Sequence, residues 1–232
     1  MVLTIWNIIG SLPEVKMTGQ NRKRSDQFRL DLFTGWTCGL SPVEQRISIF
    51  SHIRDIPYAI VPEWLGTDDI IRMMITANRG WCGPKHQLLA WMFQRLGIEI
   101  QFTLIPFRWQ DQKVRYPERL AGLLPLLPSS THLCCTALLN GTRQLIDATW
   151  DPPLRNVGFP VNDPWDGISG TIPAVIRLEQ NTETGASSGY ATHRERVQFV
   201  EGLNDWLSEV RKEENIFEKG SGEDRLFKKH SK

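Results

Sequence analysis

Three side chains in this sequence could together form a nucleophilic active site: Cys82, His132 and Asp147. A cysteine attacks carbonyl groups as the thiolate, and both a helix N-terminus and a neighbouring imidazole lower the pKa of a thiol. A carboxylate that holds the imidazole fixes its tautomer and stabilises the imidazolium. These residue types therefore predict chemistry at amide or acyl carbonyls, provided that the fold brings them together.

The segment around Cys82 is expected to open a buried helix. Residues 78–84 are rich in turn-forming types, and apolar side chains then recur at helical spacing over Lys85–Arg95, followed by Gly97 at the C-cap position. Alternating apolar and polar residues over Ile98–Leu104 predict a strand directly after this helix. Cys82 should therefore lie at the N-terminus of a helix that leads into a sheet.

A β-hairpin is expected to carry the other two side chains. His132–Leu139 and Thr142–Trp150 flank Asn140-Gly141, which is typical of a two-residue type I′ turn. If these two residues form the whole loop, the numbers of facing residues sum to 281. His132 and Asp147 then become diagonal neighbours on one side of the sheet, with Cβ atoms about 7 Å apart. That spacing is within reach of a hydrogen bond between their side chains.

The other elements follow from periodicity and capping signals. Further helices are predicted after Ser41, over Asp68–Ala77 and after Thr192, and a further strand over Ala174–Leu178. Residues 41–212 are expected to form one domain, with residues 1–40 as an N-terminal extension packed on it and residues 213–232 as a charged, frayed tail. Within the extension, the polar stretch Gln20–Ser25 predicts a surface turn.

Composition argues against several function classes. The chain has 232 residues, 41% of them hydrophobic and 23% charged, and a formal net charge of +1. It therefore lacks the positive charge typical of proteins that bind nucleic acids or anionic membranes. No apolar run approaches the roughly 20 residues that span a bilayer, and the apolar start Met1–Gly10 lacks the basic region of a secretion signal. We therefore expect a cytoplasmic protein without a nucleic-acid or membrane partner. Its four cysteines form no CxxC pair, which argues against a zinc ribbon or a disulfide scaffold.

The neighbourhoods of the three side chains resemble segments of the transglutaminase-like superfamily. Arg79–Lys85 matches the Gly-x-Cys-Gly-x-Lys run of that family, which begins a helix ending in Leu-Gly-Ile. The stretch His132–Asp151 is similar to its histidine strand and the Asp-x-Thr-Trp strand that follows. The resemblance covers Pro42–Pro153, about half of the chain.

This resemblance implies an α+β fold of the papain-like or transglutaminase-like type, with the catalytic cysteine at the N-terminus of a helix packed on an antiparallel sheet. It implies that Cys82 is the nucleophile, His132 the base and Asp147 the orienting acid. The expected substrate is a peptide, a protein or a small amide or acyl compound, and no cofactor or metal is expected. The backbone N–H of the cysteine is the default donor to the oxyanion.

Arylamine N-acetyltransferases share this pattern and provide an alternative function. Their cysteine segment reads Arg-Gly-Gly-x-Cys, whereas this chain has one glycine fewer before Cys82 and has Thr149-Trp150 where that family places a glycine-containing turn. These departures weigh against acyl transfer from a thioester donor. A non-catalytic peptide-binding module on the same fold is the third alternative. Hydrolysis versus transfer and the oligomeric state stay open.

Several neighbouring residues have an ordinary structural interpretation beside the functional one. Trp81, His86 and Trp150 could line a substrate pocket or belong to the core. His86, one helical turn after the cysteine, could also replace the other histidine as the base, and Asp151 could replace the other aspartate as its partner. A zinc site is a further alternative, with Cys82, His86, His132 and Cys134 as its ligands.

Overall fold

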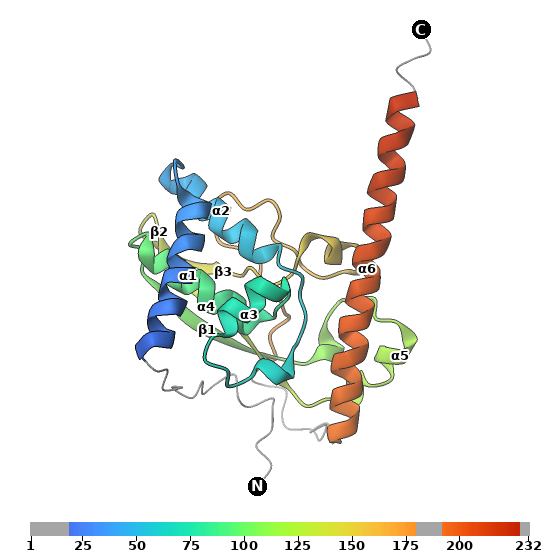
Figure 1. Ribbon diagram of the computed structural model, residues 1–232. Helices are drawn as coiled ribbons and strands as arrows, with labels where there is room; N and C mark the ends of the chain where they lie inside the picture. The colour runs from blue at the N-terminus through green and yellow to red at the C-terminus, as the bar shows by residue number, and fades with distance from the viewer. Residues whose placement is uncertain (1–18, 180–191, 228–232) are drawn as a thin grey trace.

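The computed structural model describes residues 19–179 and 192–227, with side chains described for 24–179 and 192–214. Within these ranges the protein is α+β, with a three-stranded antiparallel sheet in the order β1-β2-β3 (Figure 1). The helices are α1 (Gly19–Thr37), α2 (Pro42–Arg54), α3 (Ile70–Ala77), α4 (Cys82–Arg95), α5 (Glu118–Ala121) and α6 (His193–Phe227). The strands are β1 (Ile100–Phe107), β2 (Ser130–Leu139) and β3 (Thr142–Ile146).

The central element is α4, which packs against β1, β2, α2 and α3. Its fully buried apolar side chains include Leu88, Leu89, Met92 and Phe93. The helix begins at Cys82, three residues before the predicted start at Lys85. It can start there because Trp81 has an extended backbone at the N-cap position and Pro84 needs no hydrogen-bond acceptor in the first turn. The prediction that a cysteine opens the helix leading into the sheet is confirmed.

The predicted hairpin register is also confirmed. Leu139 pairs with Thr142 and Cys135 with Ile146, so that facing residues sum to 281. Asn140 and Gly141 both have positive φ angles, 49° and 80°, as a type I′ turn requires. The turn therefore fixes which residues of β2 and β3 share a side of the sheet.

The second strand of the hairpin is shorter than predicted. β3 ends at Ile146, whereas the alternation predicted a strand to Trp150. The backbone N–H of Asp147 donates to the Thr171 hydroxyl (2.9 Å), and that of Ala148 donates to the His86 ring (3.1 Å). These donors are satisfied by side chains from distant segments, so the strand ladder ends and residues 147–151 turn towards α4.

The predicted strand over Ala174–Leu178 is absent from the described part of the chain. Two of its backbone N–H groups donate to side chains: Ala174 to the Asp147 carboxylate (2.8 Å) and Ile176 to the Gln112 amide (2.8 Å). The N–H of Leu178 makes a backbone contact with Pro106 of β1 (2.8 Å). The segment therefore runs along the sheet without joining it as a strand.

Two polar segments are helical where the sequence predicted irregular structure. The described part of Gln20–Ser25 lies in α1, which packs on α2, and is not a surface turn. At the other end, α6 continues to Phe227, so the charged segment from Glu213 is helical where a frayed tail was predicted. Lys, Glu and Arg are good helix formers, which explains helix in stretches with few apolar residues.

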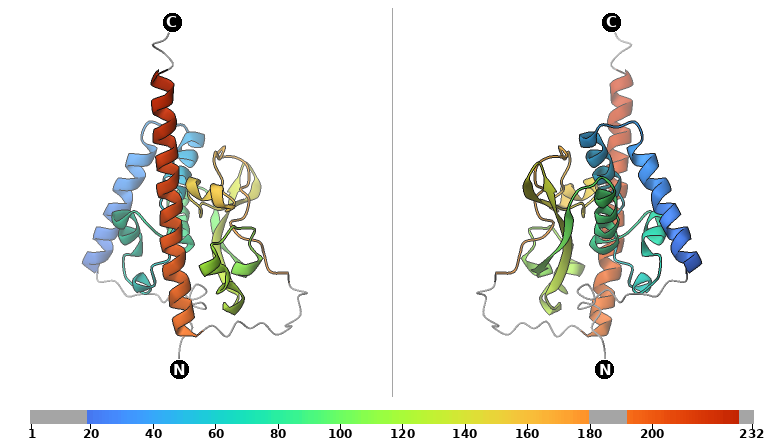
Figure 2. Two further views of the ribbon diagram at one scale, coloured as in Figure 1. Left: turned by 90° about the vertical axis from the view of Figure 1, so that its right-hand side faces the viewer. Right: turned by 90° about the vertical axis from the view of Figure 1, so that its left-hand side faces the viewer.

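The helices and the sheet lie on different sides of the molecule. Figure 2 shows α1, α2 and α3 on one side and the sheet on the other, with α6 running along the edge between them. Phe199, Leu203 and Leu207 anchor α6, and all three side chains are fully buried. None of the described helices has the length and apolar character needed to cross a bilayer.

Candidate active site

Cys82 is the first residue of α4 and lies at the wall of a cavity of about 720 Å³. The unpaired backbone N–H groups at a helix N-terminus give it a partial positive charge that favours an anion. His132, on β2, lines the same cavity, and the Cys82 thiol is among the groups that raise its pKa. The predicted thiol and imidazole therefore border one cavity that a ligand can enter.

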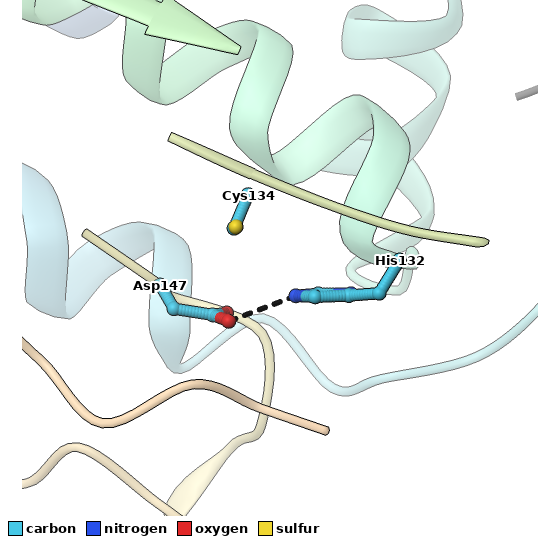
Figure 3. A group of neighbouring side chains, drawn as sticks. All are labelled: His132, Cys134 and Asp147. Carbon is cyan, nitrogen blue, oxygen red and sulfur yellow. Dashed lines mark hydrogen bonds and ion pairs between the residues drawn. The ribbon is translucent and has the colours of Figure 1, made fainter. Parts of the chain in front are cut away.

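His132 is held by Asp147 through a buried hydrogen bond. Its Nε2 donates to Asp147 Oδ2 over 2.8 Å, as Figure 3 shows. Burial alone would lower the pKa of His132, but the charge and hydrogen bond of Asp147 raise it well above its usual value, and the thiols of Cys134 and Cys82 add to this. The charged form of the imidazole is therefore favoured. The sequence predicted this role for a carboxylate that holds the imidazole.

Asp147 stays ionised although it is completely buried. Burial raises the pKa of its carboxyl, but the His132 charge and the hydrogen bonds outweigh this, so the pKa lies well below the usual range. The Thr149 hydroxyl donates to Oδ1 (2.6 Å) and the Ala174 N–H donates to Oδ2 (2.8 Å). These donors fix the carboxylate so that it faces the imidazole.

The structure places His86 in the core behind Cys82, and it is not among the residues that line the cavity. Its Nδ1 contacts the Cys82 carbonyl oxygen (2.8 Å), and its Nε2 accepts the Ala148 N–H (3.1 Å). A ring with Nε2 as acceptor carries its proton on Nδ1, which donates to that carbonyl. Burial lowers the pKa of His86 to about 4. Asp147 Oδ1 lies 3.5 Å from the same Nε2, but no proton is available there. Both nitrogens are occupied, which argues against His86 as a base.

Cys134 is a second thiol close to the same imidazole. Its Sγ, a ring nitrogen of His132 and a carboxylate oxygen of Asp147 lie within 4.8 Å of one another (Figure 3). Cys134 is fully buried, and burial raises the pKa of its thiol. It is not among the residues that line the cavity. A ligand in the cavity can therefore reach Cys82 but not Cys134.

The thiol of Cys134, the imidazole of His132 and the carboxylate of Asp147 belong to the side-chain types that bind zinc in proteins. The 2.8 Å hydrogen bond between His132 and Asp147 already joins two of them, and a metal would have to displace it. The zinc set considered from the sequence is not assembled, because both ring nitrogens of His86 are engaged elsewhere. The geometry fits an imidazole–carboxylate pair better than a metal centre.

Asp151 does not partner the imidazole and instead binds the C-terminal helix. Its carboxylate accepts two hydrogen bonds from Arg211 of α6 (2.6 and 2.9 Å) and one from the Tyr58 N–H (2.8 Å). Trp81 and Trp150 both line the cavity. Trp150 lies against the Tyr58 ring, with centroids 4.4 Å apart.

Lys85 positions the segment that carries Asp147. Its fully buried Nζ donates to the carbonyl oxygens of Thr149 (2.7 Å) and Arg54 (3.0 Å). Burial lowers the pKa of this lysine to about 7, although the negative charge of Asp151 acts in the opposite direction and raises it. The Gly-x-Cys-Gly-x-Lys run contains this residue, but nothing in the sequence showed that it joins α4 to residues 147–151 and to the end of α2.

Sequence reasoning missed Tyr58. Its ring is buried and lines the cavity together with Cys82. Burial raises the pKa of the phenol well above its usual value, and negative charge at Cys82 adds to this. The phenol therefore stays protonated on the wall of the cavity that Cys82 also borders. A parallel bridge to Gly80 holds the Tyr58 backbone next to the cysteine segment, and no local sequence signal predicts that pairing.

Comparison with known proteins gives a distant structural likeness. No protein-family model matches this chain, and no curated protein is significantly similar to it. Its structure is similar to that of a candidate cysteine protease from Cytophaga hutchinsonii, with a TM-score of 0.38 and 17% sequence identity. The match covers 65% of this chain and 49% of the other, so the chain spans about half the length of that protein.

Proposed function

We propose that this protein is a thiol-dependent enzyme of the papain-like or transglutaminase-like type that cleaves or transfers an amide or acyl group. Cys82 would be the nucleophile, His132 the acid and base, and Asp147 the residue that orients the imidazole. One observation carries the proposal: an imidazole held by a buried carboxylate at 2.8 Å and a thiol at a helix N-terminus border the same cavity.

The proposed reaction begins with a thiolate–imidazolium pair. The Cys82 sulfur attacks the carbonyl carbon, and the π-electron pair moves to the carbonyl oxygen. Because Nε2 of His132 is held by Asp147, Nδ1 is the nitrogen that gives its proton to the leaving group. The bond to the leaving group then breaks and a thioester to Cys82 remains.

Water or an amine resolves the acyl-enzyme in the second half of the reaction. His132 accepts a proton from that nucleophile as it attacks the thioester carbonyl, and collapse of the intermediate releases the product and the thiolate. The backbone N–H of Cys82 and the Tyr58 hydroxyl are the proposed donors to the oxyanion. Hydrolysis is the default outcome, because no feature of the site identifies a dedicated amine acceptor.

Acyl-enzyme formation tests this proposal directly. We would treat the protein with p-nitrophenyl acetate, quench with acid, and locate the acetyl group by peptide mass mapping. The expected result is acetylation at Cys82 in the wild type, none in Cys82→Ala, and retention of the label in Cys134→Ala, the matched loss of a thiol beside His132. A label on Cys134, or one that persists in Cys82→Ala, would contradict the proposal.

A further inference from the structure

We infer that the cavity beside Cys82 binds a bulky, largely aromatic acyl group that carries a hydrogen-bond acceptor at its far end. This inference rests on the proposed function, because it names the substrate class of that site. Throughout, the site cavity means the space of about 720 Å³ bordered by Cys82 and His132.

The size and walls of the site cavity point to an apolar acyl group much larger than acetyl. Its volume lies within the range of about 300–1,000 Å³ typical of pockets that enclose a whole small-molecule ligand. Five buried aromatic side chains line it, namely Tyr58, Trp81, Phe107, Trp109 and Trp150. Aromatic walls contribute large apolar surfaces and stack on other rings. An acetyl group would leave most of this surface without a partner.

One wall of the site cavity belongs to α6 and is fixed in place. Val197, Val200 and Asn204 of this helix line the cavity. The Asn204 amide exchanges two hydrogen bonds with the backbone of Ile60 (3.0 and 2.8 Å). These bonds hold the wall against the segment that also carries Tyr58. The cavity is therefore formed before a ligand arrives, which reduces the entropy lost on binding.

Two buried polar groups in the walls have no partner within the described structure. Trp109 Nε1 and Ser130 Oγ form no hydrogen bond, and both residues line the site cavity at 3% exposure. Buried polar groups without partners are rare and cost free energy. An indole N–H can only donate, so the missing partner must be an acceptor such as a carbonyl, ether or carboxylate oxygen.

Strand geometry places this acceptor at a distance from the reacting carbonyl. Ser130 and His132 are two residues apart on β2, so their side chains share one side of the strand about 7 Å apart. Ser130 faces Phe107 across β1 and β2, and Trp109 follows two residues later, with its ring 5.2 Å from that phenylalanine. A phenyl ring bridges this span, with its para substituent near the unpaired donors.

Three activated esters test the inference: p-nitrophenyl acetate, phenylpropanoate and para-methoxyphenylpropanoate. We would measure the rate of acylation of Cys82 from the p-nitrophenolate burst and divide each rate by that of the same ester with a small free thiol. We expect phenylpropanoate to exceed acetate by about tenfold or more, and the methoxy compound to gain roughly a further threefold.

Substitutions in the cavity walls assign these preferences. Val200→Trp fills the site cavity from α6 and should bring the phenylpropanoate rate down to that of acetate, whereas Asp205→Trp, at an exposed position of the same helix, should keep the preference. Trp109→Phe removes only the N–H and its ring edge, and should move the ratio of the two phenylpropanoates towards one. Equal normalised rates for all three esters, with Cys82 still acylated, would overturn the inference alone. Failure of every ester to acylate Cys82 would overturn the proposed function and the inference with it.

Discussion

At the scale of single residues, the proposed chemistry depends on a buried pair whose two pKa values move apart. Asp147 is held ionised and His132 is favoured as the imidazolium, and each shift has the other residue as a principal cause. The pairing could be predicted from the sequence because an Asn-Gly turn fixes the register of the hairpin. The environment of the pair could not, because Ala174 and Thr149 reach it through an irregular segment.

Removing the charge of Asp147 should weaken acylation and shift its pH profile. In Asp147→Asn the pKa of His132 falls, because the carboxylate that raises it is gone. As the pH rises, the imidazolium that accompanies the thiolate then loses its proton at a lower pH. We expect p-nitrophenyl acetate to acylate Cys82 about 10²–10⁴-fold more slowly, with the upper pH limit of the reaction moved down. An unchanged profile would show that Asp147 does not act on the imidazole.

Tyr58→Phe should separate oxyanion stabilisation from activation of the thiol. The substitution removes only the hydroxyl from a ring that packs against Trp150. Ester acylation develops an oxyanion and should slow by about 10²–10³-fold. Alkylation of Cys82 by iodoacetamide develops none and should keep its rate. Equal loss in both assays would instead mean that the phenol acts on the thiol or on the structure around it.

At the scale of elements, α4 and the end of the hairpin are joined by hydrogen bonds from side chains to the backbone rather than by a β-ladder. Lys85 and His86, on the first turns of α4, bind the backbone of Thr149 and Ala148. Alternation in the sequence predicted a strand through these residues because it records only which side chains are apolar. It does not record which distant side chains form hydrogen bonds with the backbone N–H groups. Here such hydrogen bonds replace the strand ladder after Ile146, where β3 ends.

The buried Lys85 should make stability depend on pH. Its pKa is lowered from 10.5 when unfolded to about 7 in the folded chain. The unfolded chain therefore binds more protons between these pH values, and the free energy of unfolding rises with pH across that window. Relative to Lys85→Met, the wild type should gain on the order of 2 kcal/mol between pH 7 and pH 9 in urea unfolding. A difference in the free energy of unfolding that does not change with pH would contradict the lowered pKa of Lys85.

At the scale of the whole molecule, α6 both forms one wall of the site cavity and anchors the segments that carry Asp151 and Tyr58. Arg211 binds Asp151 and also the Tyr58 carbonyl (3.0 Å). The start of this amphipathic helix was predictable from the capping box at Thr192, which the structure contains. Its docking on Asp151 was not, because 60 residues separate the two partners. The sequence offers no pattern for such a contact between single polar side chains.

Loss of the Arg211 anchor should cost far more stability than loss of an exposed ion pair on the same helix. Arg211→Ala leaves the Asp151 carboxylate, 3% exposed, without its cation, and we expect about 2–5 kcal/mol of destabilisation in urea unfolding. Arg119→Ala is the matched control, because its pair with Glu209 of α6 is half exposed. It should cost at most about 1 kcal/mol. Similar losses in the two variants would contradict the anchoring role.

The most direct test of the central claim is the rate at which iodoacetamide alkylates each cysteine, resolved by peptide mapping, in the wild type and in His132→Ala. We would work at about pH 6, where an ordinary thiol is almost wholly protonated. Cys38 is exposed and serves as the internal reference. We expect Cys82, although buried, to react faster than Cys38 in the wild type and to lose this advantage in His132→Ala. A Cys82 that reacts no faster than Cys38, or whose rate is indifferent to His132, would contradict a thiol activated by the imidazole–carboxylate pair.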